Sequence, residues 1–166
     1  MGFGATTQSK GYYDMPETVD IERILLELEL LPKYDNQIML QGIKENLDPF
    51  YGITNPPQRQ HGMKYQECVT PIFDMPYTNS IIKDLYRTRV MRMAPRTCYT
   101  YHTDPTGRVH IPLITNENCF FIIEDEVVRL PANGKIYFID TTKKHTFVNA
   151  SSEYRIHIVG CEFDTK

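Results

Sequence analysis

The sequence predicts a mainly β protein, an antiparallel sandwich or barrel with one or two supporting helices ahead of the strands. From residue 88 onward, short runs rich in Val, Ile, Tyr and Phe alternate with turn residues, which is typical of short strands. The segments with helical periodicity all lie before these runs. The length of 166 residues fits a single domain, 1–166, which we divide into a helical and loop part, 1–87, and core strands, 88–163.

The chain begins with a polar segment rich in Gly and Tyr, 1–16, which we interpret as a tail or a leading strand. A helix is predicted over 17–31, because apolar residues recur there at a spacing that places them on one side of a helix. Pro32 ends this helix, since proline has no amide hydrogen to donate. The residues of the apolar stripe are Ile21, Ile24, Leu25, Leu28 and Leu31.

A loop and a second helix complete the N-terminal part. Residues 54–65 contain two consecutive prolines and several polar side chains, and we interpret them as a loop that could cover a substrate site. The second helix is predicted over 79–87, with Ile81, Ile82 and Leu85 on its buried side. Because both helices precede the strands, we expect them to pack against one sheet from outside.

The strands follow one another closely, which favours an antiparallel sandwich or barrel. Turn residues separate them; the strongest turn signals are Asn133-Gly134 and the segment 104–107, which reads Asp-Pro-Thr-Gly. The predicted strands cover 89–93, 98–102, 108–113, 119–123, 126–130, 135–139, 145–148 and 155–161.

Composition excludes several classes of function. The formal net charge of −3 gives no electrostatic reason to expect nucleic acid or an anionic membrane surface as a partner. The sequence has neither an apolar stretch of about 20 residues nor the apolar segment of a signal peptide. The four cysteines are scattered without close pairs, so we expect reduced, buried thiols and a cytoplasmic location.

Three residues could bind one metal ion. His102 and Asp104 are two residues apart, so in an extended segment their side chains point to the same side. Alone, this pair is more typical of a surface turn than of a metal site. His145 opens a later strand and supplies the third ligand of a facial triad, which leaves three positions open on an octahedral metal. Such a triad suits iron(II) and oxygen chemistry, and zinc is the alternative metal.

Two polar pairs accompany the triad. Arg155 and His157 share one face of the last strand, and Arg108 and His110 share one face of the strand after the 104–107 turn. An arginine fork binds carboxylates through two parallel charge-assisted hydrogen bonds. These pairs also fit ordinary strands with one face in water. A cluster of inward charges, however, costs stability unless a metal or an anion pairs with it.

Taken together, these motifs resemble the aspartyl/asparaginyl β-hydroxylase-like branch of the 2-oxoglutarate oxygenases. The resemblance covers somewhat under half the chain, and it depends on the order and spacing of motifs that are individually short. The matching stretches are 94–96 (Ala-Pro-Arg), 102–106 (His-Thr-Asp-Pro-Thr), 108–113 (Arg-Val-His-Ile-Pro-Leu), 134–140 leading into His145, and Arg155.

The resemblance implies a double-stranded β-helix, also called a jelly roll, and iron(II) held by His102, Asp104 and His145. Some members carry glycine at the position of Asp104, so this chain has the fuller triad. Arg155 is implied to hold the far carboxylate of 2-oxoglutarate, with Arg108 and His110 near the carboxylate that binds iron. The implied reaction uses dioxygen to hydroxylate an amino acid, a peptide or another small molecule, and releases succinate and carbon dioxide.

Two other functions are compatible with the same residues. A non-catalytic cupin-like module would keep the fold and bind a small acid without turning it over. A zinc- or manganese-dependent cupin enzyme, such as an isomerase, would use the same pocket with another metal, although such sites usually include more histidines and a glutamate. A structural jelly roll has no need of an inward polar cluster.

Overall fold

The structure is a computed structural model that describes residues 11–53 and 64–163. Its largest feature is a six-stranded antiparallel sheet in the order β1-β10-β7-β12-β5-β2. The strands of this large sheet, in chain order, are β1 (Tyr12–Thr18), β2 (Gln37–Met39), β5 (Leu85–Met93), β7 (Arg108–Ile114), β10 (Lys135–Ile139) and β12 (Arg155–Glu162).

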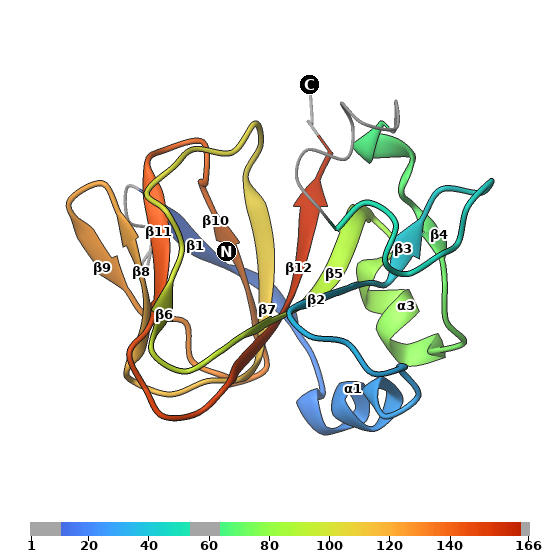
Figure 1. Ribbon diagram of the computed structural model, residues 1–166, viewed down its shortest axis with the longest axis horizontal. Helices are drawn as coiled ribbons and strands as arrows, with labels where there is room; N and C mark the ends of the chain where they lie inside the picture. The colour runs from blue at the N-terminus through green and yellow to red at the C-terminus, as the bar shows by residue number, and fades with distance from the viewer. Residues whose placement is uncertain (1–10, 54–63, 164–166) are drawn as a thin grey trace.

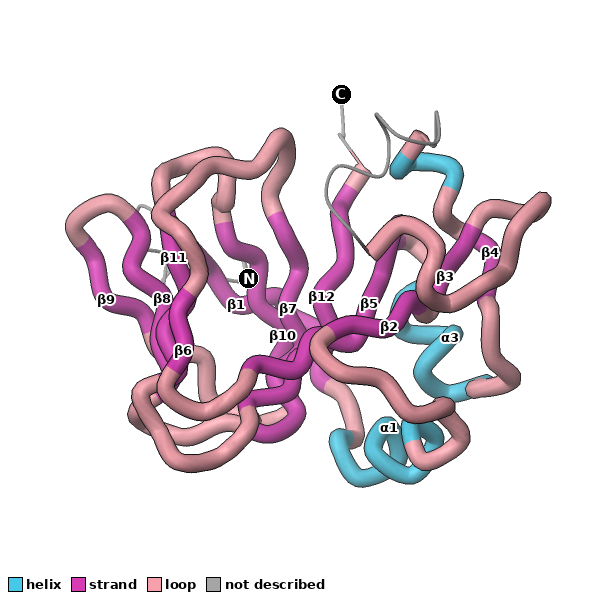
Figure 2. The backbone as a smooth tube through the Cα atoms, in the orientation of Figure 1, coloured by secondary structure: helices cyan, strands magenta, loops and turns pink. Residues whose placement is uncertain are grey.

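A smaller four-stranded sheet, in the order β6-β11-β8-β9, faces the large one (Figures 1 and 2). Its strands are β6 (Thr97–Cys98), β8 (Cys119–Ile123), β9 (Glu126–Val128) and β11 (His145–Asn149). After β5 the chain passes repeatedly from one sheet to the other, and neighbouring strands are antiparallel throughout. This is the jelly roll that the sequence resemblance implied, so the prediction of the fold is confirmed.

Two helices lie on the side of the large sheet away from the small one (Figure 1). Helix α1 (Ile21–Leu28) begins at Asp20, whose side chain accepts a hydrogen bond from the Arg23 amide, and α3 (Pro76–Ile82) has proline at its first position. A short two-stranded sheet, β3 (Gln41–Gly42) and β4 (Thr70–Pro71), and the 3₁₀ turn η1 (Tyr65–Glu67) join this part. The helices therefore support the large sheet from outside, as predicted.

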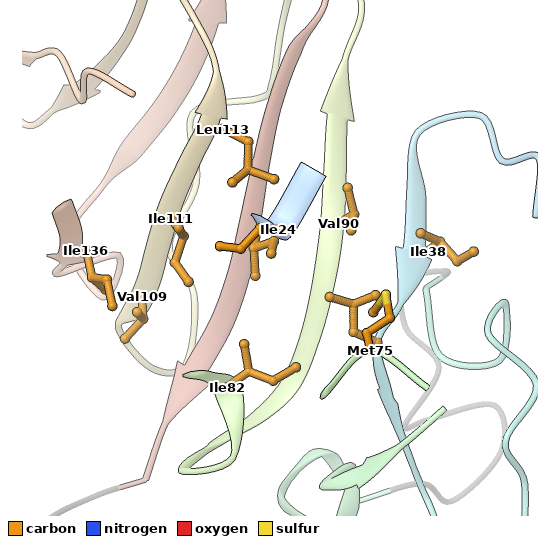
Figure 3. Close-up of a cluster of buried hydrophobic side chains, with 11 residues drawn as sticks. Ile24, Ile38, Met75, Ile82, Val90, Val109, Ile111, Leu113 and Ile136 are labelled. Atoms are coloured by element: carbon orange, nitrogen blue, oxygen red, sulfur yellow. The ribbon is translucent and has the colours of Figure 1, made fainter. Parts of the chain in front are cut away.

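Two hydrophobic cores hold these layers together. The outer core lies between the helices and the large sheet, where Ile24 and Ile82 meet Val90, Ile111 and Ile158 (Figure 3). The inner core lies between the two sheets and is made of residues from β5, β8, β9, β10 and β11 and the segment that follows β9. The inner core occupies only part of the space between the sheets, and polar side chains line the rest.

Several predicted boundaries are wrong. The second helix ends at Ile82 rather than at residue 87, because β5 begins at Leu85 and continues the alternation of the strand. The predicted strand 98–102 is a strand only over Thr97–Cys98, and the chain then leaves the sheet until a single bridge joins His102 to His145. The first helix is shorter than predicted, since residues up to Thr18 belong to β1.

The turn predicted at Asn133-Gly134 exists, but it does not make a hairpin. Gly134 has φ +83°, a conformation that glycine adopts at low cost, and its carbonyl accepts a hydrogen bond from the Val19 amide at 2.7 Å. The turn connects β9 of the small sheet to β10 of the large one. Residues 1–10 of the predicted tail or leading strand, 1–16, and residues 54–63 of the predicted loop, 54–65, lie outside the described residues. The rest of segment 1–16 lies mostly in β1, so a leading strand is present there.

No disulfide joins the four cysteines. Cys68, Cys119 and Cys161 are buried as predicted, but Cys98 is exposed and lines the cavity described below, because β6 is a two-residue edge strand. Within the described part of the chain, no helix is long and apolar enough to cross a membrane.

Candidate metal centre

The backbone brings two distant histidines side by side. His102 and His145 form an isolated antiparallel bridge, in which the His102 amide donates to the His145 carbonyl at 3.0 Å and the His145 amide donates back at 2.9 Å. The two imidazole rings consequently lie with their centroids 4.5 Å apart. His145 begins β11, so one member of the pair is held by the small sheet.

Asp104 completes the cluster from the turn that follows His102. Its amide donates to the Thr141 carbonyl at 2.8 Å, and Thr141 Oγ1 donates to the Thr106 carbonyl at 2.7 Å, so this turn is tied to the chain just before β11. The Asp104 carboxylate lies 3.6 Å from His102 Nε2 and 3.5 Å from His145 Nε2. The three ligand atoms all lie within 4.8 Å of one another.

Each imidazole is oriented by its other nitrogen. His102 Nδ1 lies 2.5 Å from the Thr100 carbonyl, and His145 Nδ1 lies 2.8 Å from the Lys143 carbonyl. A carbonyl can only accept, so in both rings Nδ1 carries the hydrogen and the neutral ring presents the lone pair of Nε2. Backbone carbonyls commonly orient metal-binding histidines in this way. The two Nε2 atoms and the carboxylate therefore face one common point.

The charged groups of the cluster shift one another's pKa values. Burial raises the pKa of Asp104, but the hydrogen bond to His145 and the charges of Arg108 and the two histidines outweigh burial and hold that pKa at about 2. Burial lowers the pKa of His145, and the neighbouring Asp104 carboxylate more than reverses this, so the net shift is upward. A carboxylate that stays ionised near neutral pH is a competent ligand for a divalent cation.

A cavity of about 1010 Å³ opens beside the three ligands. Its wall combines residues of both sheets: Arg89 and Met91 from β5, Arg108 and His110 from β7, and Phe121 and Phe147 from the small sheet. Ligand cavities of this kind usually pair an apolar wall with a few placed polar groups. Arg155 also lines this cavity, so all six of the residues predicted from the sequence border it.

Arg155 is buried, with 1% of its surface exposed. Its guanidinium lies 3.9 Å over the Phe147 ring, and Nη2 lies 3.8 Å from the Met93 sulfur. Nε and Nη1 have no hydrogen-bond partner, although burial lowers the pKa only to about 10 and the group keeps its charge at neutral pH. A buried cation with unused donors needs an anion to offset its desolvation.

Arg108 and His110 have different surroundings. Arg108 Nη1 donates to the carbonyl and the hydroxyl of Thr106, and Nη2 lies 3.8 Å from Asp104, so this arginine braces the ligand turn. His110 Nδ1 lies 3.1 Å from His157 Nδ1. Burial and the nearby arginines lower the pKa of both His110 and His157, so both rings stay neutral. His157 lies behind the cavity and holds His110 at its wall.

Sequence reasoning missed two functional candidates on β5. Arg87 and Arg89 are buried and line the cavity, yet residue 87 was predicted to end a helix. The available signal was the spacing of two residues between the arginines, which continues through Met91 and Met93 as one face of a strand. The helical periodicity of the preceding residues obscured it.

The residues present fit a six-coordinate divalent metal. Adjacent ligand atoms about 2.1 Å from an ion and at right angles lie about 3 Å apart, so the observed separations of 3.5 and 3.6 Å need only a small inward adjustment. Two imidazoles and one carboxylate on one side of an ion are the facial triad of non-haem iron(II) oxygenases. A cluster of this kind inside a jelly roll, at the edge of a cavity, is the arrangement that such a metal site requires.

The comparisons with known proteins give the family. The family model of the aspartyl/asparaginyl beta-hydroxylases matches residues 62–163, and the chain belongs to this family, a branch of the iron(II)- and 2-oxoglutarate-dependent oxygenases. The match includes all three ligands and the four arginines of the cavity. A search of curated protein sequences finds no match.

One solved structure shows the same fold at low sequence identity. An oxidoreductase of the 2OG-Fe(II) oxygenase family from Burkholderia pseudomallei has a TM-score of 0.57 and 15% identity, with 95% of this chain and 86% of that chain covered. AviO1 from Streptomyces viridochromogenes Tue57 has a TM-score of 0.49 and 13% identity, with 94% of this chain and 91% of that chain covered.

Proposed function

We propose that the protein is an iron(II)- and 2-oxoglutarate-dependent dioxygenase that hydroxylates an amino acid, a peptide or another small molecule. The observation that carries the proposal is the convergence of His102, Asp104 and His145 within 4.8 Å at the edge of a cavity that is also lined by Arg155, a buried arginine with two donors that no protein group pairs. Membership of a family of hydroxylases supports the same conclusion independently of this geometry.

In this proposal His102 and His145 bind iron through Nε2, and Asp104 supplies the carboxylate. Iron(II), when bound with 2-oxoglutarate, supplies the activation of dioxygen and the oxidative decarboxylation that yields succinate and carbon dioxide. The protein orients the reactants and excludes water, which is the usual division of labour in such enzymes. The carbonyls of Thr100 and Lys143 keep both imidazoles in the tautomer that metal binding requires.

Arg155 holds the distal carboxylate of 2-oxoglutarate. It stacks over Phe147, which lies two residues beyond His145 on β11, a step of about 7 Å along a strand. That step suits a short dicarboxylate with one end at the metal and the other at the guanidinium. Nη1 of Arg155 has no hydrogen-bond partner and Nη2 contacts the Met93 sulfur, a weak acceptor, so these two groups form the fork available to this carboxylate.

His145→Ala provides the direct test. The variant loses one of three ligands, so we expect iron bound under anaerobic conditions and succinate release from 2-oxoglutarate to fall to background, while the fold is kept. Lys144→Ala is the matched control, because Lys144 is the exposed neighbour of His145 and should leave both readouts unchanged. Full iron binding and turnover in His145→Ala would remove the triad from the mechanism.

A further inference from the structure

Arg87 and Arg89 form a second cationic site in the cavity, apart from Arg155. Both lie on β5, and their exposed fractions are only 5% and 7%. Both line the cavity beside the candidate metal centre. Two buried guanidinium groups so close together are unusual unless anions offset their charge.

Neutral groups hold the two arginines in place. Arg87 Nη2 donates to the Gly52 carbonyl at 3.1 Å, and its guanidinium stacks 3.8 Å from the centre of the Tyr65 ring. Arg89 Nη1 donates to Gln37 Oε1 at 2.9 Å. The Nε atom of each has no hydrogen-bond partner, and no ion pair in the described part of the chain joins either arginine to a carboxylate. Both side chains therefore keep unused donors.

The backbone around Arg87 is bent into a conformation that costs energy. Arg87 has φ +50°, which is uncommon for any residue other than glycine, and it lies in a bulge of the β5–β12 pair. The pairing shifts between Val159, opposite Arg89, and Cys161, opposite Tyr86. Backbone strain of this kind is concentrated at functional sites, where a bulge re-aims a side chain.

The local charge balance leaves these cations uncompensated. The nearest carboxylate of the cavity is Asp104, which already contacts His102, His145 and Arg108. Burial, together with the charges of Arg87 and Arg108, lowers the pKa of Arg89 to about 9. Arg89 keeps its charge at neutral pH. Among the described residues, those that line the cavity therefore include four arginines but a single carboxylate, that of Asp104.

The second site lies well away from Arg155. Arg155 pairs with Met93 across β5 and β12, whereas Val159 pairs with Arg89. Four residues along a strand span about 13 Å, so Arg155 and Arg89 leave the sheet at well-separated points. Arg89 instead lies near enough to Asp104 for their charges to interact. Arg87 and Arg89 thus line the cavity beside the candidate metal centre, at positions on the sheet distinct from that of Arg155.

We propose that Arg87 and Arg89 bind an anionic group, a carboxylate or a phosphate, of the substrate that is hydroxylated. This inference rests on the proposed function, and it narrows the substrate class to acids. The anionic group would hold one end of the substrate at the two arginines and leave the reacting carbon facing the metal. Gln37 and Tyr65 position the arginines without neutralising them.

The experiment uses the metal-loaded protein saturated with N-oxalylglycine, an inert 2-oxoglutarate analogue that occupies the Arg155 site. Glutarate and glycerol 1-phosphate are then titrated by calorimetry, each beside its uncharged match, glutaramide and glycerol. We expect at least one acid to bind at least tenfold more tightly than its match. The acid that binds distinguishes a carboxylate site from a phosphate site.

Variants test the assignment. Arg87→Gln and Arg89→Gln should each weaken the binding of that acid at least tenfold and leave N-oxalylglycine affinity within about twofold. Arg89→Lys keeps the charge and should retain part of the affinity. Arg92→Gln is the matched control, because Arg92 lies on the same strand but stacks on Tyr154, 3.9 Å from its ring centre, and does not line the cavity.

Equal binding of both acids and their uncharged matches by the unmodified protein would overturn this inference. So would full affinity in both glutamine variants. If the proposed function is wrong, the result is different: the unmodified protein does not bind N-oxalylglycine in a metal-dependent way. In that case the acids are titrated against the protein without the analogue, and an acid preference that depends on Arg87 and Arg89 still supports an anion site.

Discussion

The two faces of the large sheet carry opposite kinds of side chain, although the same strands supply both. On the outer face, Val90 and Ile111 pack against the helices (Figure 3), and Ile158 belongs to the same core. On the inner face lie the residues that directly precede these three in the same strands, namely Arg89, His110 and His157. Because successive side chains of a strand point to opposite faces, one segment serves both purposes.

The difference indicates that the outer face contributes mainly to folding stability and the inner face mainly to ligand binding. The outer face buries apolar surface, which is the main favourable contribution to folding. The inner face buries four arginines and two neutral histidines, which gain little unless ligands bind. We therefore expect substitutions on the outer face to change the free energy of unfolding, and substitutions on the inner face to change ligand binding.

Ile158→Ala should have the largest effect. Ile158 is fully buried in the outer core on the central strand β12, and removal of its side chain leaves a cavity that the packed helices and strands cannot fill. The free energy of unfolding should fall by about 2–5 kcal/mol. Urea denaturation measures this change. A loss below about 1 kcal/mol would mean that the outer face does not carry the stability assigned to it.

Arg155→Met should affect ligand binding strongly and folding stability little, which is the behaviour expected of the inner face. Methionine fills a similar volume without a buried charge, so the free energy of unfolding of the ligand-free protein should stay the same or rise. The dissociation constant for 2-oxoglutarate should increase about 10- to 100-fold, because the charge-assisted hydrogen bonds to one carboxylate are lost. Anaerobic titration in the presence of iron measures the affinity, and an unchanged constant would exclude Arg155 from this role.

The buried histidines predict a smaller effect of pH. His110 and His157 have lowered pKa values, so the unfolded chain, with histidine pKa values near about 6.5, takes up their protons first as the pH falls. Stability should consequently decrease below that pH, by about 1 kcal/mol between pH 7 and 6 for the two rings together. His145, whose pKa is raised in the metal-free protein, contributes in the opposite sense.

His157→Gln isolates this contribution, because it removes one of the two titrating rings and leaves His145 in place. The decrease in stability between pH 7 and 6 should be roughly half that of the unmodified protein, as measured by denaturant titration at each pH. An identical decrease in both proteins would show that the buried rings do not govern stability in this range.

The sequence by itself determined which residues could act together within one strand or turn. His102 and Asp104 are neighbours in the chain, and the pairs Arg108 with His110 and Arg155 with His157 follow from the period of two in a strand. From residue 108 onward the predicted strands for the same reason end within two residues of the observed ones, since an alternation of apolar and polar residues is a local property.

The tertiary structure alone decided which of these groups meet. The pairing of His102 with His145 across 43 positions depends on one backbone bridge between a loop and a strand. Arg87 lies in a bulge where the pairing of β5 with β12 shifts, and the sequence does not mark the position of that bulge. Register and bulges arise from the packing of whole sheets, so the distance between Arg155 and Arg89, and with it the number of anion sites, could not be read from the chain.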